Sequence, residues 1–389
     1  MSVTADVHSH TSRPVLRGAS ARAALATQVV STELWDRTVK RFDQVCQEQL
    51  YVFAKERWPK VALEPVLFWS GGEVIGGCLV MLQRLPLGIA TLAIVKWGPI
   101  LVRSDHPRAT ELYRQMVDAL VEDYARARGH LLSILPHAAF GPFNVEYDHL
   151  IHRGFSKGSQ FGFPDRYIVK LRLTDDEQRA SFEQKWRYHL KKSEKAGLVF
   201  ERGDTSRLRE FEALYDAMLD RKKFSDHSGY STLKALMAIE DEALRPELFF
   251  VRHLGEVIAG AVIFKAGKRA VYLYGATNDQ ALPLRAGYFM HWNIIRWLRD
   301  NTSADWYDLG GTDGYQGLHQ FKKGMVGEAG VIQPVPPAAT YASRNWPRVA
   351  GTLAFRFRDL ANDAIRWVET RRAGHAQPDQ KRRLAGDAE

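Results

Sequence analysis

The stretch from Asp305 to Gly324 reads DWYDLGGTDGYQGLHQFKKG, and its motifs guide the interpretation of the rest of the chain. Aromatic and branched residues at its start suit a short β-strand. Four glycines follow, and because they adopt a positive φ at little cost, the backbone can turn sharply there. Phe321 and Lys322 come next, at helical or turn spacing. A strand, a glycine-rich turn and a fixed cation favour a site that holds an anion, or the charge that develops during acyl transfer.

The size and charge of the chain limit the classes of protein to which it can belong. A chain of 389 residues exceeds what a single hydrophobic core usually fills, so two domains are expected. Hydrophobic residues make up 45% and charged residues 25%, which is typical of a soluble globular protein. The formal net charge of +9 favours an anionic partner, such as a nucleic acid, a nucleotide-linked substrate or an anionic membrane face. A solvated basic surface is the alternative.

The sequence predicts a cytoplasmic protein without a metal centre. Its two cysteines, Cys46 and Cys78, cannot form a disulfide framework or a metal cluster, and they fit a reducing compartment. His149 and His152 have no further ligand residue at metal-binding spacing nearby. The most apolar window, residues 76–95, is interrupted by polar residues and a proline, so it is too broken to cross a bilayer. The N-terminal residues make a poor signal sequence.

One segment of the chain occurs twice. Residues 64–77 read EPVLFWSGGEVIGG and residues 247–260 read ELFFVRHLGEVIAG. The GEVI tetrapeptide is intact in both, and the offset of 183 residues is the same from the first glutamate (64 to 247) and from the glycine (72 to 255). Each copy predicts a strand, a tight turn and a second strand. The shared register indicates an internal duplication.

The segments after the two copies also repeat. Each hairpin is followed by a strand, a helix with one apolar face and a further strand, at 89–97, 109–128 and 131–135 and again at 270–275, 287–299 and 306–309. This order makes a mixed sheet with helices on its faces. The predicted fold class is therefore α/β, of the α+β type, and it resembles two tandem GNAT-like acyltransferase domains. The expected domains are residues 31–173 and 174–340, the second including a connecting helix.

That connecting helix is predicted over residues 174–197 and is basic. Acidic residues suit its first turn, a glycine suits its C-terminal end, and an apolar stripe recurs every fourth residue: Phe182, Trp186 and Leu190. A second stripe at the same spacing is basic: Arg187, Lys191 and Lys195. Because like charges at this spacing are mildly unfavourable in an isolated helix, a facing nucleic acid is expected. An ordinary solvated face is the alternative.

The two ends of the chain are predicted to lie outside the domains. Residues 1–30 and 374–389 lack apolar periodicity and are expected to be disordered tails. Residues 341–373 contain an amphipathic helix surrounded by arginines. This helix is expected to dock on a domain, or to make a peripheral contact with the anionic inner face of the membrane.

The motifs of several enzyme classes are missing. The chain has no GxxxxGK[ST], HExxH or GxSxG motif, and no GxGxxG motif after a strand. Acyl-CoA enzymes of GNAT type usually hold the CoA pyrophosphate on a glycine-rich loop before the central helix. Residues 282–286, LPLRA, precede the helix at Gly287 and do not fit such a loop, so a CoA donor is disfavoured. Arg285 is the residue there that can contact a phosphate.

The closing motif resembles that of one family. The segments YDLGG at 307–311 and GLHQFKKG at 317–324 resemble the C-terminal signature of the FemABX peptidyltransferases, and the resemblance extends over residues 30–340. It implies transfer of an amino acid, without a cofactor, from aminoacyl-tRNA to an amine on a nucleotide- or lipid-linked peptidoglycan precursor. Relatives with the same paired domains imply an alternative. This is an N- or O-acyltransferase of exopolysaccharide or cell-envelope synthesis that uses acetyl-CoA or another acyl-CoA.

The resemblance also implies roles for individual residues. Lys322 matches the family lysine that neutralises charge on the reacting carbonyl, and Phe321 is its neighbour at the site. Arg221 matches an arginine that grips substrate phosphate, and Tyr274 matches an aromatic residue that contacts the precursor. Tyr272 alternates with Tyr274 along a strand and is expected to share its face.

The residues themselves leave other interpretations open. A lysine after a glycine turn is often solvated, and Arg221 can close a helix end beside the negative end of the helix dipole. The two tyrosines can belong to the core. Asp308 is expected to cap the turn at Gly310 and Gly311 through its side-chain oxygen rather than to act as a base. A third class of function is a catalytically inactive duplicate that binds an anionic glycan or nucleotide.

Overall fold

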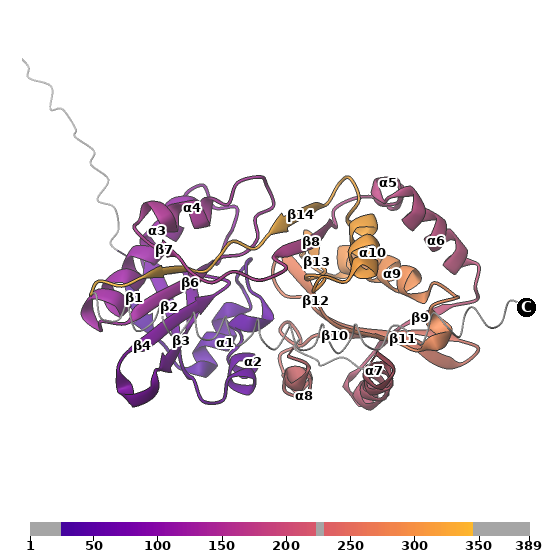
Figure 1. The fold of residues 1–389 in the computed structure, drawn as a ribbon, viewed down its shortest axis with the longest axis horizontal. Helices are drawn as coiled ribbons and strands as arrows, with labels where there is room; N and C mark the ends of the chain where they lie inside the picture. The colour runs from indigo at the N-terminus through magenta and orange to yellow at the C-terminus, as the bar shows by residue number, and fades with distance from the viewer. Residues whose placement is uncertain (1–24, 223–228, 345–389) are drawn as a thin grey trace, which may run out of the picture.

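A computed structural model describes residues 25–222 and 229–344 of the chain. Two mixed β-sheets lie side by side in it, each covered by helices on both faces (Figure 1). The predicted class, two α/β domains, is confirmed. The predicted tail at 374–389 lies outside the described residues, as does the predicted helix at 341–373 except for its first four residues.

The first sheet runs in the order β1-β2-β3-β4-β6-β15-β7, with β5 paired to β3. Only β4 and β6 are parallel neighbours among these strands. The strands are β1 (Ala26–Val29), β2 (Ala62–Ser70), β3 (Glu73–Arg84), β4 (Thr91–Lys96), β5 (Ile100–Leu101), β6 (Leu131–Leu135), β7 (Ser156–Lys157) and β15 (Ala339–Tyr341).

Helices cover both faces of this sheet because its strands alternate apolar side chains between two cores. Val66 and Phe68 face α3 (Ala109–Leu120), which continues as a π-helical segment at Val121–Ala127, and α4 (Val145–His152) lies beside it. Leu67 faces the other way, toward α1 (Thr32–Val39) and α2 (Tyr51–Arg57). This period of two is what a sheet buried on both faces requires.

The second sheet runs in the order β14-β8-β13-β12-β11-β10-β9. Its strands are β8 (Asp165–Lys170), β9 (Val199–Gly203), β10 (Glu247–His253), β11 (Glu256–Phe264), β12 (Arg269–Thr277), β13 (Trp306–Asp308) and β14 (Val331–Pro334). One face packs against α6 (Gln184–Glu194), α9 (Ala286–Asn301) and α10 (Gln316–Val326). The other packs against α7 (Leu208–Lys222) and α8 (Leu233–Met237). Short 3-10 turns lie at Gln47–Gln49, Pro86–Gly88, Thr205–Arg207, Tyr230–Thr232 and Asp279–Ala281.

The sequence repeat is also a structural repeat. The hairpin β2-β3 corresponds to β10-β11, the next strand β4 to β12, the long helix α3 to α9, and the parallel strand β6 to β13. In both sheets these strands are neighbours in the same order. A parallel pair of strands needs a crossover connection, and the long helix supplies it. The predicted duplication is therefore confirmed.

The two sheets exchange chain segments at their open edges. Strand β8 precedes the proposed boundary at 173/174, yet it pairs with β13 and β14 in the second sheet. Strand β15 comes from the end of the described chain and pairs with β6 and β7 in the first sheet. Each crossing strand pairs backbone groups that would otherwise be exposed at a sheet edge. The described chain therefore crosses between the sheets twice, between β7 and β8 and between β14 and β15, whereas the repeat alone predicts one crossing.

Part of the predicted N-terminal tail is ordered. Residues 26–29 form β1, which pairs antiparallel with β2 from Ala26 opposite Trp69 to Val29 opposite Val66. All four side chains are exposed, so this edge strand is held by backbone hydrogen bonds and carries no apolar periodicity. The prediction of a tail over residues 1–30 is wrong for this segment. Residues 1–24 lie outside the described part of the chain.

The predicted basic helix is two helices, α5 (Asp175–Ser181) and α6. Thr174 and Glu177 form a capping box at the start of α5. The backbone is extended at Phe182, and the Glu183 amide donates to the carbonyl of Gly324 on α10 instead of continuing the helix. A single helix over 174–197 is therefore wrong, because this contact with α10 breaks it.

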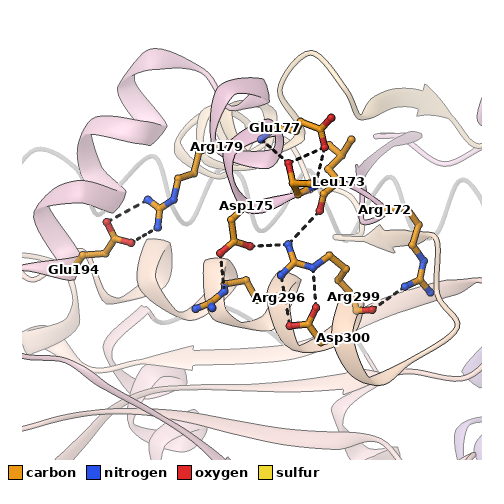
Figure 2. Close-up of polar contacts among 10 residues, drawn as sticks. Arg172, Leu173, Asp175, Glu177, Arg179, Glu194, Arg296, Arg299 and Asp300 are labelled. Atoms are coloured by element: carbon orange, nitrogen blue, oxygen red, sulfur yellow. Dashed lines mark hydrogen bonds and ion pairs between the residues drawn. The ribbon is translucent and has the colours of Figure 1, made fainter.

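Ion pairs stabilise the broken helix pair (Figure 2). Arg179 of α5 pairs with Glu194 of α6 at 2.5 Å and so links the two helices across the break. Asp175 lies 2.6 Å from Arg299 and 3.2 Å from Arg296, both on α9. Such partly exposed pairs are individually weak, but together they fix α5 on the central helix of the second domain.

An apolar cluster joins the two domains. Phe42, Leu50 and Phe53 from the first domain share it with Leu244 and Phe264 from the second. Buried side chains from both halves in one cluster hold the domains in one arrangement, as the core of a single domain would. The polar groups at the edge of this junction are therefore also held in place.

Candidate functional site

The glycine turn, residues 309–315, joins β13 to α10. Asp308 accepts a hydrogen bond of 2.9 Å from the Gly310 amide, so the cap predicted for this carboxylate is confirmed. Gly310 and Gly314 have φ of +75° and +82°. A Cβ on Gly314 would lie 2.5 Å from the ring of Phe163, so this position needs glycine both for its backbone and for space.

Lys322 lies beneath the glycine turn. Its side chain is 6% exposed, and its Nζ donates hydrogen bonds of 2.5 Å to the carbonyl oxygens of Leu309 and Gly311. Burial and the nearby charge of Arg166 lower the pKa of Lys322 to about 8. The alternative of a solvated lysine is therefore wrong. An ammonium carries three N–H donors, and the two backbone carbonyls use two of them.

An aromatic cluster with a neutral histidine lies near Lys322. Phe321 lies 5.6 Å and Tyr272 4.9 Å from the ring of His291, between ring centroids. The Nδ1 of His291 lies 3.1 Å from the hydroxyl of Tyr307. Burial and the charge of Lys322 lower the pKa of His291 to about 3, so its imidazole is neutral near pH 7. The only sequence signal for His291 is a polar residue on the buried face of a predicted helix.

Two arginines meet at one buried carboxylate. Asp308 is 2% exposed, and its oxygens lie 3.1 Å from the Nε of Arg166 and 3.6 Å from Nη1 of Arg269. Burial alone would raise the pKa of Asp308, but the two arginines outweigh it and hold that pKa below its usual value. Sequence reasoning missed both arginines, because they stand on separate strands and only the sheet brings them to Asp308.

Aromatic side chains of the first domain complete this junction. Trp97 stacks on His137 and on Phe161, with centroids 5.3 Å and 6.2 Å apart. Arg269 donates a hydrogen bond of 2.9 Å to the carbonyl of Ala138, and its guanidinium lies 4.3 Å from the ring centroid of Phe140. The charged groups of the second domain therefore rest directly on the first domain.

Tyr272 and Tyr274 lie on opposite faces of the second sheet. A bulge places Tyr272 opposite Ile263 and Tyr274 opposite Val262, so two residues of one strand span three of the other. Tyr274 is buried on the α7 face, where its hydroxyl donates to the Gly229 carbonyl at 2.9 Å. The predicted shared face is wrong, because a bulge interrupts the period of two that the prediction assumed.

The other predicted contact residues are divided between these faces. Arg221 lies on α7, the helix that covers Tyr274, but its side chain is outside the described residues. Phe321 packs on the other face, against the rings of Trp186 and Tyr288. The structure thus gathers Phe321, Tyr272 and Lys322 and separates them from Tyr274.

Arg285 stands at the start of α9 in a left-handed conformation, with φ of +58°. Its Nε is buried and has no hydrogen-bond partner among the described residues. Burial and the charge of Arg285 lower the pKa of the neighbouring His189. An arginine beside the free amides of a long helix is a favourable environment for a phosphate group, and the contact of Arg285 with a phosphate stays a prediction.

The basic stripe of the connecting helix is divided. Arg187 donates through Nη1 to the carbonyls of Ala180, at 3.0 Å, and Phe182, so it stabilises the break between α5 and α6. Lys191 and Lys195 are exposed, and neither forms an ion pair within residues 25–222 and 229–344. Two of the three predicted nucleic-acid-binding residues are therefore free to meet an anion.

The described residues form neither a membrane span nor a metal site. No helix there has the length and apolar character that a membrane span requires. No group of three or more His, Cys, Asp or Glu side chains there is arranged to hold a metal ion.

The similarity of this chain to known proteins agrees with this architecture. A family model described as an acetyltransferase (GNAT) domain matches residues 180–323. The crystal structure of FemX superposes with a TM-score of 0.65 at 20% identity, over 82% of this chain and 97% of that one. The chain is FemABX-like in fold. Its FemABX-like fold is also similar to the C-terminal domain of a putative lysylphosphatidylglycerol synthetase from Agrobacterium fabrum, with a TM-score of 0.50 and 16% identity over 83% of this chain and 97% of that one.

A curated relative matches a short part of the sequence. The lipid II:glycine glycyltransferase of Staphylococcus aureus is 32% identical to this chain over 76 residues. That match covers 18% of this chain and 18% of the relative's own length. The chain therefore matches less than a fifth of that protein.

Proposed function

We propose that this FemABX-like protein is an acyltransferase that joins an amino acid from aminoacyl-tRNA to an amine on a peptidoglycan precursor linked to a nucleotide or a lipid. The observation that carries the proposal is the position of Lys322. It is a buried ammonium under a glycine turn, in a domain that matches an acetyltransferase family. The short match to a lipid II:glycine glycyltransferase supports the choice of acceptor.

The chemistry of amide formation fits such a cation. The acceptor amine attacks the ester carbonyl carbon of the donor, a C–N bond forms, and the carbonyl oxygen becomes an oxyanion. When this intermediate collapses, the ester C–O bond breaks, the tRNA hydroxyl leaves, and it takes up the proton that the amine gives up. The third N–H of Lys322 would stabilise the oxyanion, and one such donor contributes about 3 to 4 kcal/mol to the barrier.

The partners follow from charge. Lys191 on α6 and Lys195, the residue directly after that helix, are proposed to contact the tRNA, so binding of tRNA should weaken steeply with salt. The family resemblance assigns Arg221 and Tyr274 to the acceptor. Because Tyr274 is buried with its hydroxyl bonded to Gly229, Arg221 is proposed to make this contact. The predicted helix within residues 341–373 is proposed to touch the inner membrane face of a cytoplasmic protein, because it is amphipathic and basic.

A second candidate has its own supporting observation. At the start of α9, Arg285 has a buried Nε without a hydrogen-bond partner in the part of the chain that the structure describes, and a phosphate of an acyl-CoA donor would meet free helix amides there. The alternative is therefore an acyl-CoA-dependent N- or O-acyltransferase of cell-envelope or exopolysaccharide synthesis. In that case the donor would be acetyl-CoA or another acyl-CoA.

The test is a comparison of donors. Purified protein is titrated by calorimetry with charged tRNA and with acetyl-CoA, and product formation on a lipid- or nucleotide-linked precursor is followed by mass spectrometry. Amide formation that requires charged tRNA is the expected result. Tight binding of acetyl-CoA that is lost in Arg285→Ala would favour the second candidate. Binding of glycan or nucleotide without any turnover would leave the inactive duplicate.

A further inference from the structure

Arg166 is held by the protein from one side. Its Nε lies 3.1 Å and 3.3 Å from the two carboxylate oxygens of Asp308. Among the described residues, neither of its terminal Nη groups has a hydrogen-bond partner. The side chain is 24% exposed, so these donors are accessible from solvent. A guanidinium fixed at Nε and free at its other end is prepared for a planar anion with two oxygens.

The face of the same guanidinium is also fixed. Its central carbon lies 5.7 Å from the ring centroid of Trp97, which belongs to the first domain. Trp97 is itself buried and stacked on His137 and Phe161. Because one contact fixes the edge of Arg166 and another its face, little side-chain freedom remains to be lost when a ligand binds.

Asp308 serves two arginines at once. Arg166 and Arg269 share this one buried carboxylate, and Lys322 is close enough that the charge of Arg166 lowers its pKa. Glu48 also acts on Arg166, but it is paired with Lys96 at 3.0 Å, while Glu146 acts on Arg269 and Asp313 on Lys322. Among the described residues, Arg166 thus shares its one ion-pair carboxylate with a second arginine, and a bound anion would relieve the repulsion between the two.

Exposed aromatic rings surround this cationic centre. Phe140 is 40% exposed, stacks on Trp306 and contacts Arg269, and Phe161 is 48% exposed and stacks on Trp97. Large apolar side chains gathered at a surface are typical of binding sites. Flat rings next to a cation suit a ligand that carries its anionic group beside a sugar face, a base or an apolar side chain.

We propose that Arg166 is the main anion-binding residue of a site at the domain junction. This site binds the carboxylate or phosphate of a substrate in which the group next to the anion has a flat apolar face. This site deepens the proposed function and rests on it for one point, namely that the anion belongs to the acceptor. Residues of both domains would then hold the acceptor close to Lys322.

Calorimetry with three probes tests this site without any turnover. The probes are uridine diphosphate, inorganic pyrophosphate and N-acetyl-D-alanine. We expect the wild type to bind at least one of them, and Arg166→Ala to raise its Kd about tenfold or more. Arg166→Lys keeps the charge but loses the planar fork, so an intermediate Kd is expected. Binding of the phosphates alone would identify a phosphate site, and binding of the acetylated amino acid alone a carboxylate site.

Arg128→Ala is the matched control. Its guanidinium also lies over an aromatic ring, that of Tyr124 at 4.5 Å, and it also pairs with carboxylates, Glu64 and Asp123. These partners of Arg128 all belong to the first domain and none of them contacts Arg166, so the Kd of each probe should be unchanged. Thermal melting of each variant shows that it is folded. If Arg166→Ala does not fold, Arg166→Lys decides.

Two results would overturn the inference: no probe binds the wild type at millimolar concentration, or the Arg166 variants bind as the wild type does. These outcomes are separable from failure of the proposed function. A protein that binds a probe through Arg166 but transfers no acyl group contradicts the proposed function alone. An active enzyme whose KM for the acceptor is the same in the Arg166 variants as in the wild type contradicts the inference alone.

Discussion

The ammonium of Lys322 donates a 2.5 Å hydrogen bond to the carbonyl oxygen of Leu309, the last residue before the first glycine of the turn. With the matching bond to Gly311, this contact links α10 to the end of β13. The residue that the family resemblance implicates in chemistry is therefore also a clamp on the turn beside it. Variants of Lys322 must be interpreted with both roles in mind.

Replacement of Lys322 changes two opposing contributions to stability. A fall in pKa from 10.5 to about 8 corresponds to about 3 kcal/mol of unfavourable burial for the charged form. Loss of the ammonium removes this cost, but it leaves two carbonyls unpaired at about 1 to 3 kcal/mol each. In urea denaturation, we expect the free energy of unfolding of Lys322→Met to lie within about 2 kcal/mol of the wild-type value. We expect Lys322→Ala to be less stable because it also leaves a cavity. A Lys322→Met protein that does not fold would contradict this balance.

The lowered pKa of Lys322 predicts that activity and stability respond oppositely to pH. Above pH 8 the folded protein loses the Lys322 proton while the unfolded chain keeps it up to about 10.5, so this group raises stability as pH rises through that window. The neutral amine cannot stabilise an oxyanion well, so kcat should fall above pH 8. The free energy of unfolding in urea is measured against pH for the wild type and for Lys322→Met, and the difference between the two curves is the contribution of the Lys322 ammonium. A wild-type kcat that is flat up to pH 10 would contradict the prediction.

Glu146 predicts a second pH dependence, at the domain junction. Burial raises its pKa to about 7, although Gln44 and Arg269 partly oppose the shift. The folded protein therefore holds a proton that the unfolded chain releases near pH 4.5, and the stability that this proton contributes is lost as pH rises from about 4.5 through about 7. Glu146→Gln should equal the wild type below pH 5 and melt higher at pH 8. The exposed Glu122→Gln variant, a control, should show no such divergence; equal melting of Glu146→Gln and wild type at pH 8 would contradict the prediction.

Two glycines in the same region should respond differently to alanine. Gly314 has a φ of +82° and a Cβ there would meet Phe163, so Gly314→Ala should cost about 1 to 3 kcal/mol in the free energy of unfolding. Gly317 lies in the first turn of α10 with open space around it, so Gly317→Ala should be neutral or stabilising by up to about 1 kcal/mol. Chemical denaturation of both variants checks this. Equal effects would mean that the turn has another conformation.

The duplicated fold was predictable because periodicity and repetition are local properties of the sequence. The second GEVI hairpin, the apolar face of 287–299 and the strand at 306–309 each appear at or within a few residues of the predicted positions. The break at Phe182 was not predictable, since it depends on a contact with Gly324 on a distant helix. The bulge that separates Tyr272 from Tyr274 leaves no mark on the alternation of residue types.

The candidate site was predictable only in part, for a related reason. Lys322 and the cap by Asp308 belong to one continuous motif, so the sequence places them together. Arg166 and Arg269 join that motif only because β8 and β12 lie on either side of β13. His291 carries no motif of its own, and its neutral state follows from burial that the sequence does not reveal.

The single-turnover rate of amide formation tests the central role of Lys322 most directly. Charged tRNA and acceptor are mixed with wild type, Lys322→Met, and Lys323→Ala, an exposed neighbour on the same helix. The proposed oxyanion contact predicts a loss of about 100-fold or more in Lys322→Met and no loss in Lys323→Ala, with all three proteins folded. Transfer by folded Lys322→Met at the wild-type rate would contradict it.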